Sequence, residues 1–157
     1  MTLHNMNLSE EGIAFIKQWE GFRAKAYICP AGKITIGYGH VLKPNENYDH
    51  LTEGISDSIA TDLLLKDLKL VEDNINIKVK APLFQNQYDA LCSLVYNVGC
   101  GAFNRSRGLL QLNKENYKDA IIEFFSKERG FVNINANKSL GLINRRKAEQ
   151  ILWEKNG

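Results

Sequence analysis

Hydrophobic residues recur at helical spacing along most of the chain. Ser9, Glu10 and Glu11 have the character of a helix start, because acidic side chains are favoured near the positive end of the helix dipole. The apolar residues behind them predict a helix over 9–20, which ends near Gly21. A long amphipathic helix is expected after Ser56, with its apolar face made of Ile59, Leu63, Leu64, Leu68, Val71 and Ile75.

A second helical pattern runs from about 82 to 98 and should stop at Gly99. Its expected inward positions are Phe84, Tyr88, Leu91, Cys92, Val95 and Tyr96. Shorter helices are predicted over 106–112, 116–126 and 141–155.

Between 24 and 40 the period changes from helical to extended. Two short β-prone runs, 26–28 and 33–36, flank a turn at 29–32 that contains Pro30 and Gly32. Gly37 and Gly39 predict a bend where the backbone approaches another group closely. The pattern therefore predicts an α+β fold, with a small antiparallel sheet in an N-terminal lobe and a larger helical C-terminal lobe.

Composition places the chain among ordinary globular proteins. Its 157 residues suffice for one domain with a core, and no apolar run approaches the roughly 20 residues that cross a bilayer. The N-terminus has no signal-peptide pattern, so access to a substrate outside the cytoplasm would need another agent. Stable membrane insertion is not expected.

Charge is unevenly distributed. Residues 1–100 carry a net charge of −3, whereas residues 101–157 carry +5. A basic C-terminal part would suit an anionic polymer, but for so small an excess a solvated helical surface is the favoured explanation.

Three cysteines, Cys29, Cys92 and Cys100, do not form a disulfide framework pattern, and reduced thiols are the expected state. Cys92 and Cys100 bracket a helix end and could still pair on oxidation. No His, Cys, Asp or Glu group has metal-ligand spacing, and no nucleotide-binding loop is present. Neither a metal nor a cofactor is expected.

Candidate chemistry concentrates where the first helix meets the hairpin. Glu20 lies at the predicted helix end between Trp19 and Phe22, where partial burial would favour a protonated carboxyl suited to general acid catalysis. A surface glutamate at a frayed helix end is the simpler alternative from the local sequence alone.

The spacing of polar residues favours the catalytic interpretation. Eight residues separate Glu20 from Cys29, and five separate Cys29 from Thr35, within Glu20-Gly21…Tyr27…Gly32…Thr35-Ile36-Gly37-Tyr38-Gly39-His40. This segment resembles the catalytic signature of phage-type lysozymes, glycoside hydrolase family twenty-four. Residues 89–103 resemble the family's central helix and glycine turn, and residues 141–153 resemble its C-terminal helix.

The resemblance implies a single lysozyme-like domain over 1–157. Its sheet-bearing lobe would span about 20–55, and its helical lobe about 56–157 together with the helix 9–20. It implies an endolysin-type muramidase that hydrolyses the β-1,4 bond between N-acetylmuramic acid and N-acetylglucosamine in peptidoglycan. The implied catalytic residues are Glu20 as the acid, with Cys29 and Thr35.

The resemblance also implies roles for residues outside the catalytic set, and some of these have a structural alternative. The implied substrate-binding positions are Gly39, Val41, Tyr96, Asn97 and Ser106, although Tyr96 could equally be core and Asn97 a helix cap. His40 is expected to be a structural histidine behind the site. Arg145 resembles the family's arginine that approaches the glutamate, whereas Arg146 is expected to be a solvated helix charge.

Cys29 departs from the common pattern, in which an aspartate forms the carboxylate pair. A thiol ionises near pH 8.5, so Cys29 could be a thiolate base or nucleophile, a weak polar partner or a bystander. The resemblance implies inversion with a water held by Thr35, whereas a thiolate nucleophile would give retention.

Alternative functions remain open at this stage. A lytic transglycosylase would need only one acid/base residue, and a non-catalytic wall-binding module would tolerate Cys29. Nucleic-acid binding is not expected, because no recognition motif accompanies the basic C-terminal part. The resemblance further implies a monomer that stays in the host cytoplasm until a holin permeabilises the membrane, and then acts in the periplasm and cell wall.

Overall fold

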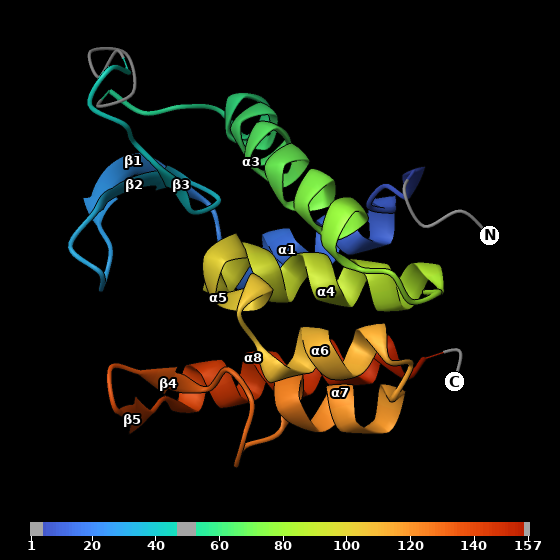
Figure 1. The fold of residues 1–157 in the computed structure, drawn as a ribbon. Coiled ribbons are helices and arrows are strands. Elements are labelled where there is room, and N and C mark those ends of the chain that lie inside the picture. Colours follow the sequence, from blue (N-terminus) through green and yellow to red (C-terminus); the bar gives the residue numbers. More distant parts are fainter. Residues whose placement is uncertain (1–4, 47–52, 156–157) are drawn as a thin grey trace. The chain divides into compact units, whose positions relative to one another are not determined.

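The computed structural model describes residues 5–46 and 53–155 and divides into two compact units (Figure 1). The sheet-bearing unit comprises Ala14–Leu70, and the helical unit comprises Met1–Ile13 with Val71–Gly157. The sheet-bearing unit is longer than the expected lobe over 20–55, because it takes in parts of the helices α1 and α3 on either side of the sheet.

Helix α1 (Glu10–Glu20) begins where the sequence predicts it. The amide of Gly12 donates to Ser9 Oγ at 3.0 Å, so Ser9 caps the first turn. Asp89 of the helical unit accepts hydrogen bonds from both the amide and the hydroxyl of Ser9. At the other end the amide of Gly21 donates to Lys17 O, and its positive φ of 73° ends the helix before the first strand.

Three antiparallel strands follow in the order β1-β2-β3: β1 (Arg23–Ile28), β2 (Ile34–Gly37) and β3 (His40–Val41). Tyr27 lies opposite Thr35, and Thr35 lies opposite Val41. The register of β1 shifts between Arg23 and Tyr27. The predicted turn is present, since the amide of Gly32 donates to Cys29 O at 2.8 Å.

Helix α3 (Asp57–Lys78) packs its first half against the sheet. Gly37 has a φ of 67°, and a Cβ there would lie 3.1 Å from the Ala60 side chain. The close approach predicted at Gly37 is therefore made by this helix. The core of the sheet-bearing unit contains the fully buried side chain of Ile36, but Ile59, predicted on the apolar face, is 43% exposed.

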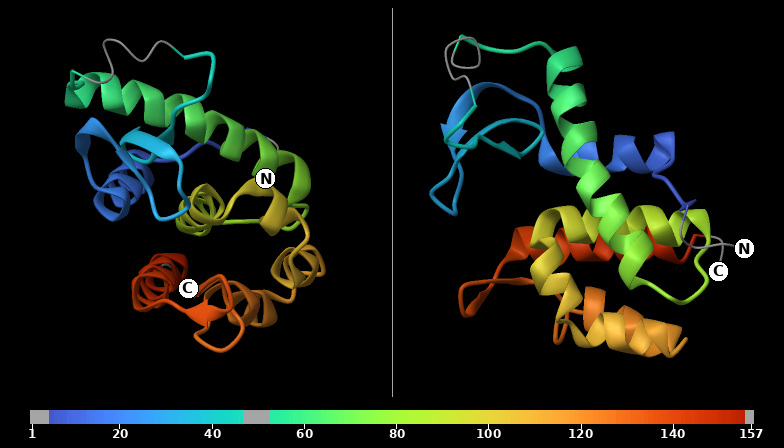
Figure 2. Two further views of the ribbon diagram at one scale, coloured as in Figure 1. Left: turned by 90° about the vertical axis from the view of Figure 1, so that its left-hand side faces the viewer. Right: turned by 45° about the horizontal axis from the view of Figure 1, so that its top comes forward.

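The helical unit contains the second half of α3 and a set of shorter helices. These are α4 (Gln85–Val98), α5 (Cys100–Asn104), α6 (Arg107–Asn113), α7 (Tyr117–Phe125) and α8 (Leu140–Trp153). Helix α8 packs along α4, and α6 packs on α7 (Figure 2). Aromatic contacts among Phe103, Phe124, Phe125 and Trp153 fill the space between them.

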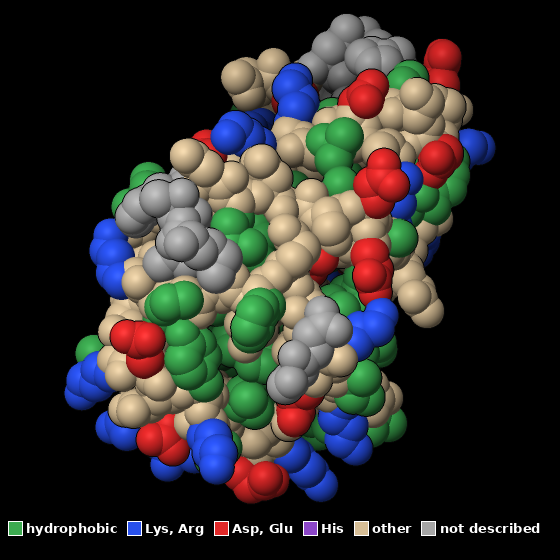
Figure 3. Space-filling model, turned by 90° about the vertical axis from the view of Figure 1, so that its right-hand side faces the viewer, with side chains coloured by type: hydrophobic (Ala, Val, Ile, Leu, Met, Phe, Trp, Pro, Cys, Tyr) green, Lys and Arg blue, Asp and Glu red, His purple; other side chains and the backbone are tan. Residues whose placement is uncertain are grey.

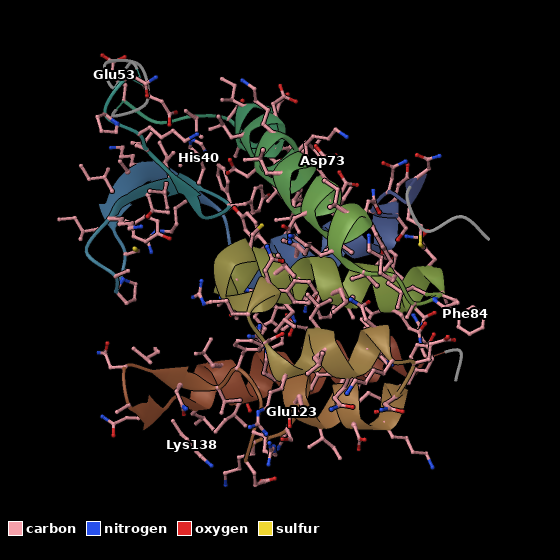
Figure 4. The ribbon with its side chains drawn as sticks, viewed as in Figure 1. His40, Glu53, Asp73, Phe84, Glu123 and Lys138 are labelled. Carbon is pink, nitrogen blue, oxygen red and sulfur yellow. The ribbon has the colours of Figure 1, made fainter. Side chains whose placement is uncertain are left out.

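The start of α4 differs from the prediction. The helix begins at Gln85, and Phe84 occupies the cap position, where its amide donates to Gln87 Oε1 at 2.8 Å. Phe84 is 61% exposed and points away from the helices (Figure 4), so its expected inward position is wrong. Gly99 ends the helix as predicted, with its amide bonded to Val95 O.

Arg146 was expected to be a solvated charge, and this expectation is wrong. Its side chain is fully buried on α8, where Nε lies 2.6 Å from Glu149 Oε1. Arg145, also buried, pairs with the same carboxylate at 3.4 Å, and Ser93 Oγ donates to it from α4. Helical spacing placed these three charges on one face, and the packing of α8 against α4 made that face internal.

Two elements had no counterpart in the expected helices and strands. Helix α5 follows Gly99 directly, and a hairpin joins β4 (Asn133–Ile134) to β5 (Asn137–Lys138). Asn135 in the hairpin turn has a φ of 56°, a conformation that asparagine tolerates better than most residues. The Asn-rich stretch around it was the signal in the sequence for this turn.

The predicted α+β class is confirmed. No helix in the described parts of the chain is long and apolar enough to cross a membrane. On the face drawn in Figure 3, acidic and basic side chains are interspersed, and no patch of a single sign dominates it.

Candidate active site

Glu20 is the last residue of α1 and is half-buried. Its position follows from the helix stop at Gly21, which turns the chain directly into β1. The carboxyl therefore lies at the negative end of the helix dipole, beside the first strand of the sheet.

One face of the sheet carries the other two candidate catalytic residues. Side chains that lie opposite each other in an antiparallel pair share a face, so Tyr27, Thr35 and Val41 lie together. Cys29 is two residues beyond Tyr27 and belongs to the same face. The register thus places Cys29, Thr35 and Val41 on one face of the sheet.

Hydrogen bonds at the hairpin turn favour an ionised thiol at Cys29. The backbone of Lys33 and the Thr35 side chain bond to the thiol, and both lower its pKa. Thr35 itself is 3% exposed, and its hydroxyl lies 3.1 Å from Lys33 O. Because a hydroxyl has one proton, Thr35 can donate either to that carbonyl or to the sulfur, which makes it a switchable donor beside Cys29.

Tyr27 connects these groups electrostatically to Glu20. Burial raises the pKa of the Tyr27 hydroxyl, Arg23 lowers it, and the negative charges of Glu20 and Cys29 raise it again. Glu20 and Cys29 therefore both act electrostatically on the same phenol. Tyr27 and Arg23 were not among the predicted site residues, although Tyr27 is part of the sequence signature.

His40 lies on the opposite face of the sheet, because its partner in the register is Ile36 and not Thr35. Its Nδ1 is 2.7 Å from Asp67 of α3, and its Nε2 is 3.0 Å from Glu46. The hydrogen bond to Asp67 is the main cause that raises the pKa of His40, and burial opposes it. This geometry ties the sheet to α3 and supports a structural role.

Comparison with known proteins decides the family. The phage lysozyme family model matches residues 17–149. This chain belongs to the phage lysozyme family. It is therefore a glycoside hydrolase of the muramidase type.

Two curated endolysins show how far this membership extends. The chain is 42% identical over 149 residues to an endolysin of Acyrthosiphon pisum secondary endosymbiont phage 1, covering 95% of this chain and 99% of that one. It is 45% identical over 119 residues to the endolysin of Salmonella phage P22, covering 76% and 82%. A crystal structure of a P22 lysozyme mutant matches with a TM-score of 0.80 and 39% identity, covering 96% and 99%.

The remaining family positions lie in the helical unit. Arg145 Nη2 lies 3.3 Å from Ser93 O, and Nε lies 3.4 Å from Glu149. Its predicted approach to Glu20 stays a prediction. The same holds for the substrate contacts of Tyr96, which is half-buried, and of Asn97, which is exposed on the last turn of α4.

Ser106 has a structural task that the sequence did not indicate. Its hydroxyl donates to Phe103 O at 2.7 Å and accepts from the Leu109 amide at 3.1 Å, which caps α6. A role in saccharide binding would use the oxygen's remaining lone pair. Gly39, also predicted to contact substrate, forms the β2–β3 turn with a φ of 83°.

Within residues 5–46 and 53–155, no group of three His, Cys, Asp or Glu side chains could hold a metal ion. The three cysteines are free thiols, with Cys92 buried and Cys29 and Cys100 partly exposed. The chemistry assembled in the sheet-bearing unit is therefore that of a carboxyl, a thiol and a hydroxyl.

Proposed function

We propose that this protein is an endolysin that hydrolyses the β-1,4 bond between N-acetylmuramic acid and N-acetylglucosamine, with Glu20 as the general acid. The observation that carries the proposal is the grouping of Cys29 and Thr35 on one sheet face, in the hairpin that directly follows the helix ending at Glu20. Peptidoglycan is the substrate, and cleavage of the wall leads to lysis of the bacterial cell.

Glycoside hydrolysis needs a proton for the departing oxygen and a group that directs water to the anomeric carbon. Glu20 transfers its proton to the glycosidic oxygen as that bond breaks. Thr35 holds the attacking water, and the Cys29 thiolate accepts the proton that the water loses. Water attack on the opposite side of the sugar inverts the anomeric configuration.

The lowered pKa of Cys29 supports this assignment, because a thiolate can replace the carboxylate that commonly occupies the position. Direct attack by the sulfur would instead form a covalent glycosyl intermediate and retain the configuration. Thr35 favours the first course, since its hydroxyl can accept from a water while donating to the sulfur.

The supporting positions complete the proposal. Gly39, Val41, Tyr96, Asn97 and Ser106 contact the glycan, and Arg145 and His40 have supporting roles. The enzyme works as a monomer without a metal or cofactor. It remains in the host cytoplasm until a holin opens the membrane, and then acts at the wall.

The test is a digestion of purified peptidoglycan by the wild type and by Glu20→Gln, with new glycan ends identified by mass spectrometry. Wild type should release reducing N-acetylmuramic acid ends, and Glu20→Gln should be slower by at least about a hundredfold. Glu10→Gln is the matched control, because it changes an exposed acid on the same helix.

Any other outcome of the digestion would contradict a specific part of the proposal. Anhydromuramic ends would show a lytic transglycosylase, and the absence of new ends with binding retained would show a wall-binding module. Near wild-type activity in Glu20→Gln would remove Glu20 from the mechanism.

A further inference from the structure

Arg23 lies on the same sheet face as the candidate catalytic residues. It is the first residue of β1 and pairs with Gly37, two residues beyond Thr35 on β2. Opposite and alternate positions share a face, so Arg23, Tyr27, Cys29 and Thr35 form one surface. The guanidinium carbon of Arg23 lies 4.2 Å from the centroid of the Tyr27 ring.

Arg23 differs from the three arginines whose ion pairs the structure shows. Arg129 pairs with Glu123, and Arg145 and Arg146 both pair with Glu149. Among the described residues, no carboxylate lies within ion-pair distance of Arg23, and its side chain is exposed. Stacking on Tyr27 holds the planar group in a fixed orientation while its edge N–H groups stay available.

A guanidinium presented in this way fits a carboxylate through two parallel hydrogen bonds. Peptidoglycan strands carry free carboxylates on their stem peptides, and on those muramoyl groups that bear no peptide. We infer that Arg23, oriented by Tyr27, is a specificity-determining residue that binds a carboxylate of the glycan strand beside the cleaved bond. The inference rests on the proposed function, because it assumes that the strand crosses this sheet face.

Lys25 provides the matched control. It is an exposed cation on the same strand, but its Cγ lies 3.8 Å from the point where a Cβ on Gly54 would sit. Its side chain is thus directed toward the segment before α3. Removing its charge changes the net charge of the protein equally, without changing the cation stacked on Tyr27.

The experiment compares kcat/KM of wild type, Arg23→Gln, Arg23→Lys and Lys25→Gln on native strands and on amidated strands. The amidated strands are prepared with carbodiimide and ammonia, which converts free carboxylates to neutral amides. On native strands Arg23→Gln should lose about five- to tenfold in kcat/KM, the range expected for a partly solvated charge-assisted contact. Arg23→Lys should recover part of this loss, because it keeps the charge without the planar fork.

On amidated strands, Arg23→Gln should have the same kcat/KM as the wild type. Lys25→Gln should match the kcat/KM of the wild type on both native and amidated strands. A third substrate, strands stripped of stem peptides by an amidase, has its muramoyl carboxylates exposed. If Arg23→Gln loses kcat/KM on native strands but not on these stripped strands, the ligand in native strands is a stem-peptide carboxylate. A loss of kcat/KM on the stripped strands shows that Arg23 also binds a muramoyl carboxylate once the amidase has freed it.

Three results would overturn the inference. These are an equal loss on native and amidated strands, no loss on native strands, and a shifted pH–rate profile of Arg23→Gln on both substrates. The last would show that Arg23 acts on the ionisation of Glu20 or Cys29. Failure of the proposed function is distinct, because the wild type would then release no reducing muramic ends from native strands.

Discussion

Glu149→Gln tests the buried charge cluster of the helical unit. The Glu149 carboxylate is fully buried and faces two guanidinium groups, with Arg146 Nε at 2.6 Å and Arg145 Nε at 3.4 Å. Burial raises the pKa of the Glu149 carboxyl, whereas the two arginines lower it and stabilise the ionised form that can pair with both. The amide keeps the shape of the side chain but removes its negative charge, so the two buried guanidinium groups lose the ion pairs that they make with Glu149.

The burial of this carboxylate sets the expected loss of stability in Glu149→Gln. Breaking a buried ion pair by removing one partner costs about 3–5 kcal/mol in the free energy of unfolding, because the remaining charge stays desolvated. For a chain of this length, that loss lowers Tm by roughly 6–20 °C. The control is Glu123→Gln, whose partner Arg129 is 50% exposed, and which should cost about 0.2–1 kcal/mol.

Urea denaturation of wild type and both variants at neutral pH measures the difference, with the m-value checked for constancy. Because the substitution and the type of partner are the same, the two variants differ mainly in the burial of the pair. Equal destabilisation of Glu149→Gln and Glu123→Gln would refute the reasoning, since burial would then have no effect on the contribution of the pair.

Three further predictions concern other parts of the chain. Folding raises the pKa of His40, so the ion pairs of the protonated ring stabilise the protein at low pH and this contribution is lost as pH rises through the raised pKa. In urea titrations, His40→Gln should therefore lower the free energy of unfolding more at about pH 5.5 than at about pH 8.5. An equal loss at both pH values would contradict this prediction. Gly108→Ala places a Cβ 2.2 Å from the buried Phe124 ring and should cost about 3 kcal/mol, whereas Gly141→Ala, with 3.7 Å of clearance, should stay within about 1 kcal/mol. Cys29→Asp should keep wall-lytic activity, while Cys29→Ser should lose about a hundredfold in kcat. Wild-type activity in Cys29→Ser would make the thiol a bystander, and a folded but inactive Cys29→Asp would show that the reaction needs sulfur.

Much of the candidate site could be predicted from the sequence because its residues are close together in the chain. Glu20 ends a helix, Cys29 starts a turn and Thr35 lies in the following strand, so all three belong to one short helix–hairpin segment. The contribution of Arg23 could not be predicted in this way. The register shift of β1 between Arg23 and Tyr27 decides which side chains share the face, and no sequence pattern specified that shift.

The sequence by itself determined the order and kind of most elements, since hydrophobic periodicity and glycine or proline stops are local properties. It also determined the family, through residues whose spacing matches a known signature. Only the tertiary structure decided that Arg146 is buried beside Glu149, that Phe84 is exposed, and that α3 covers the sheet at Gly37. The physical reason is that burial depends on which other element covers a residue, and that choice is made by packing between segments far apart in the chain.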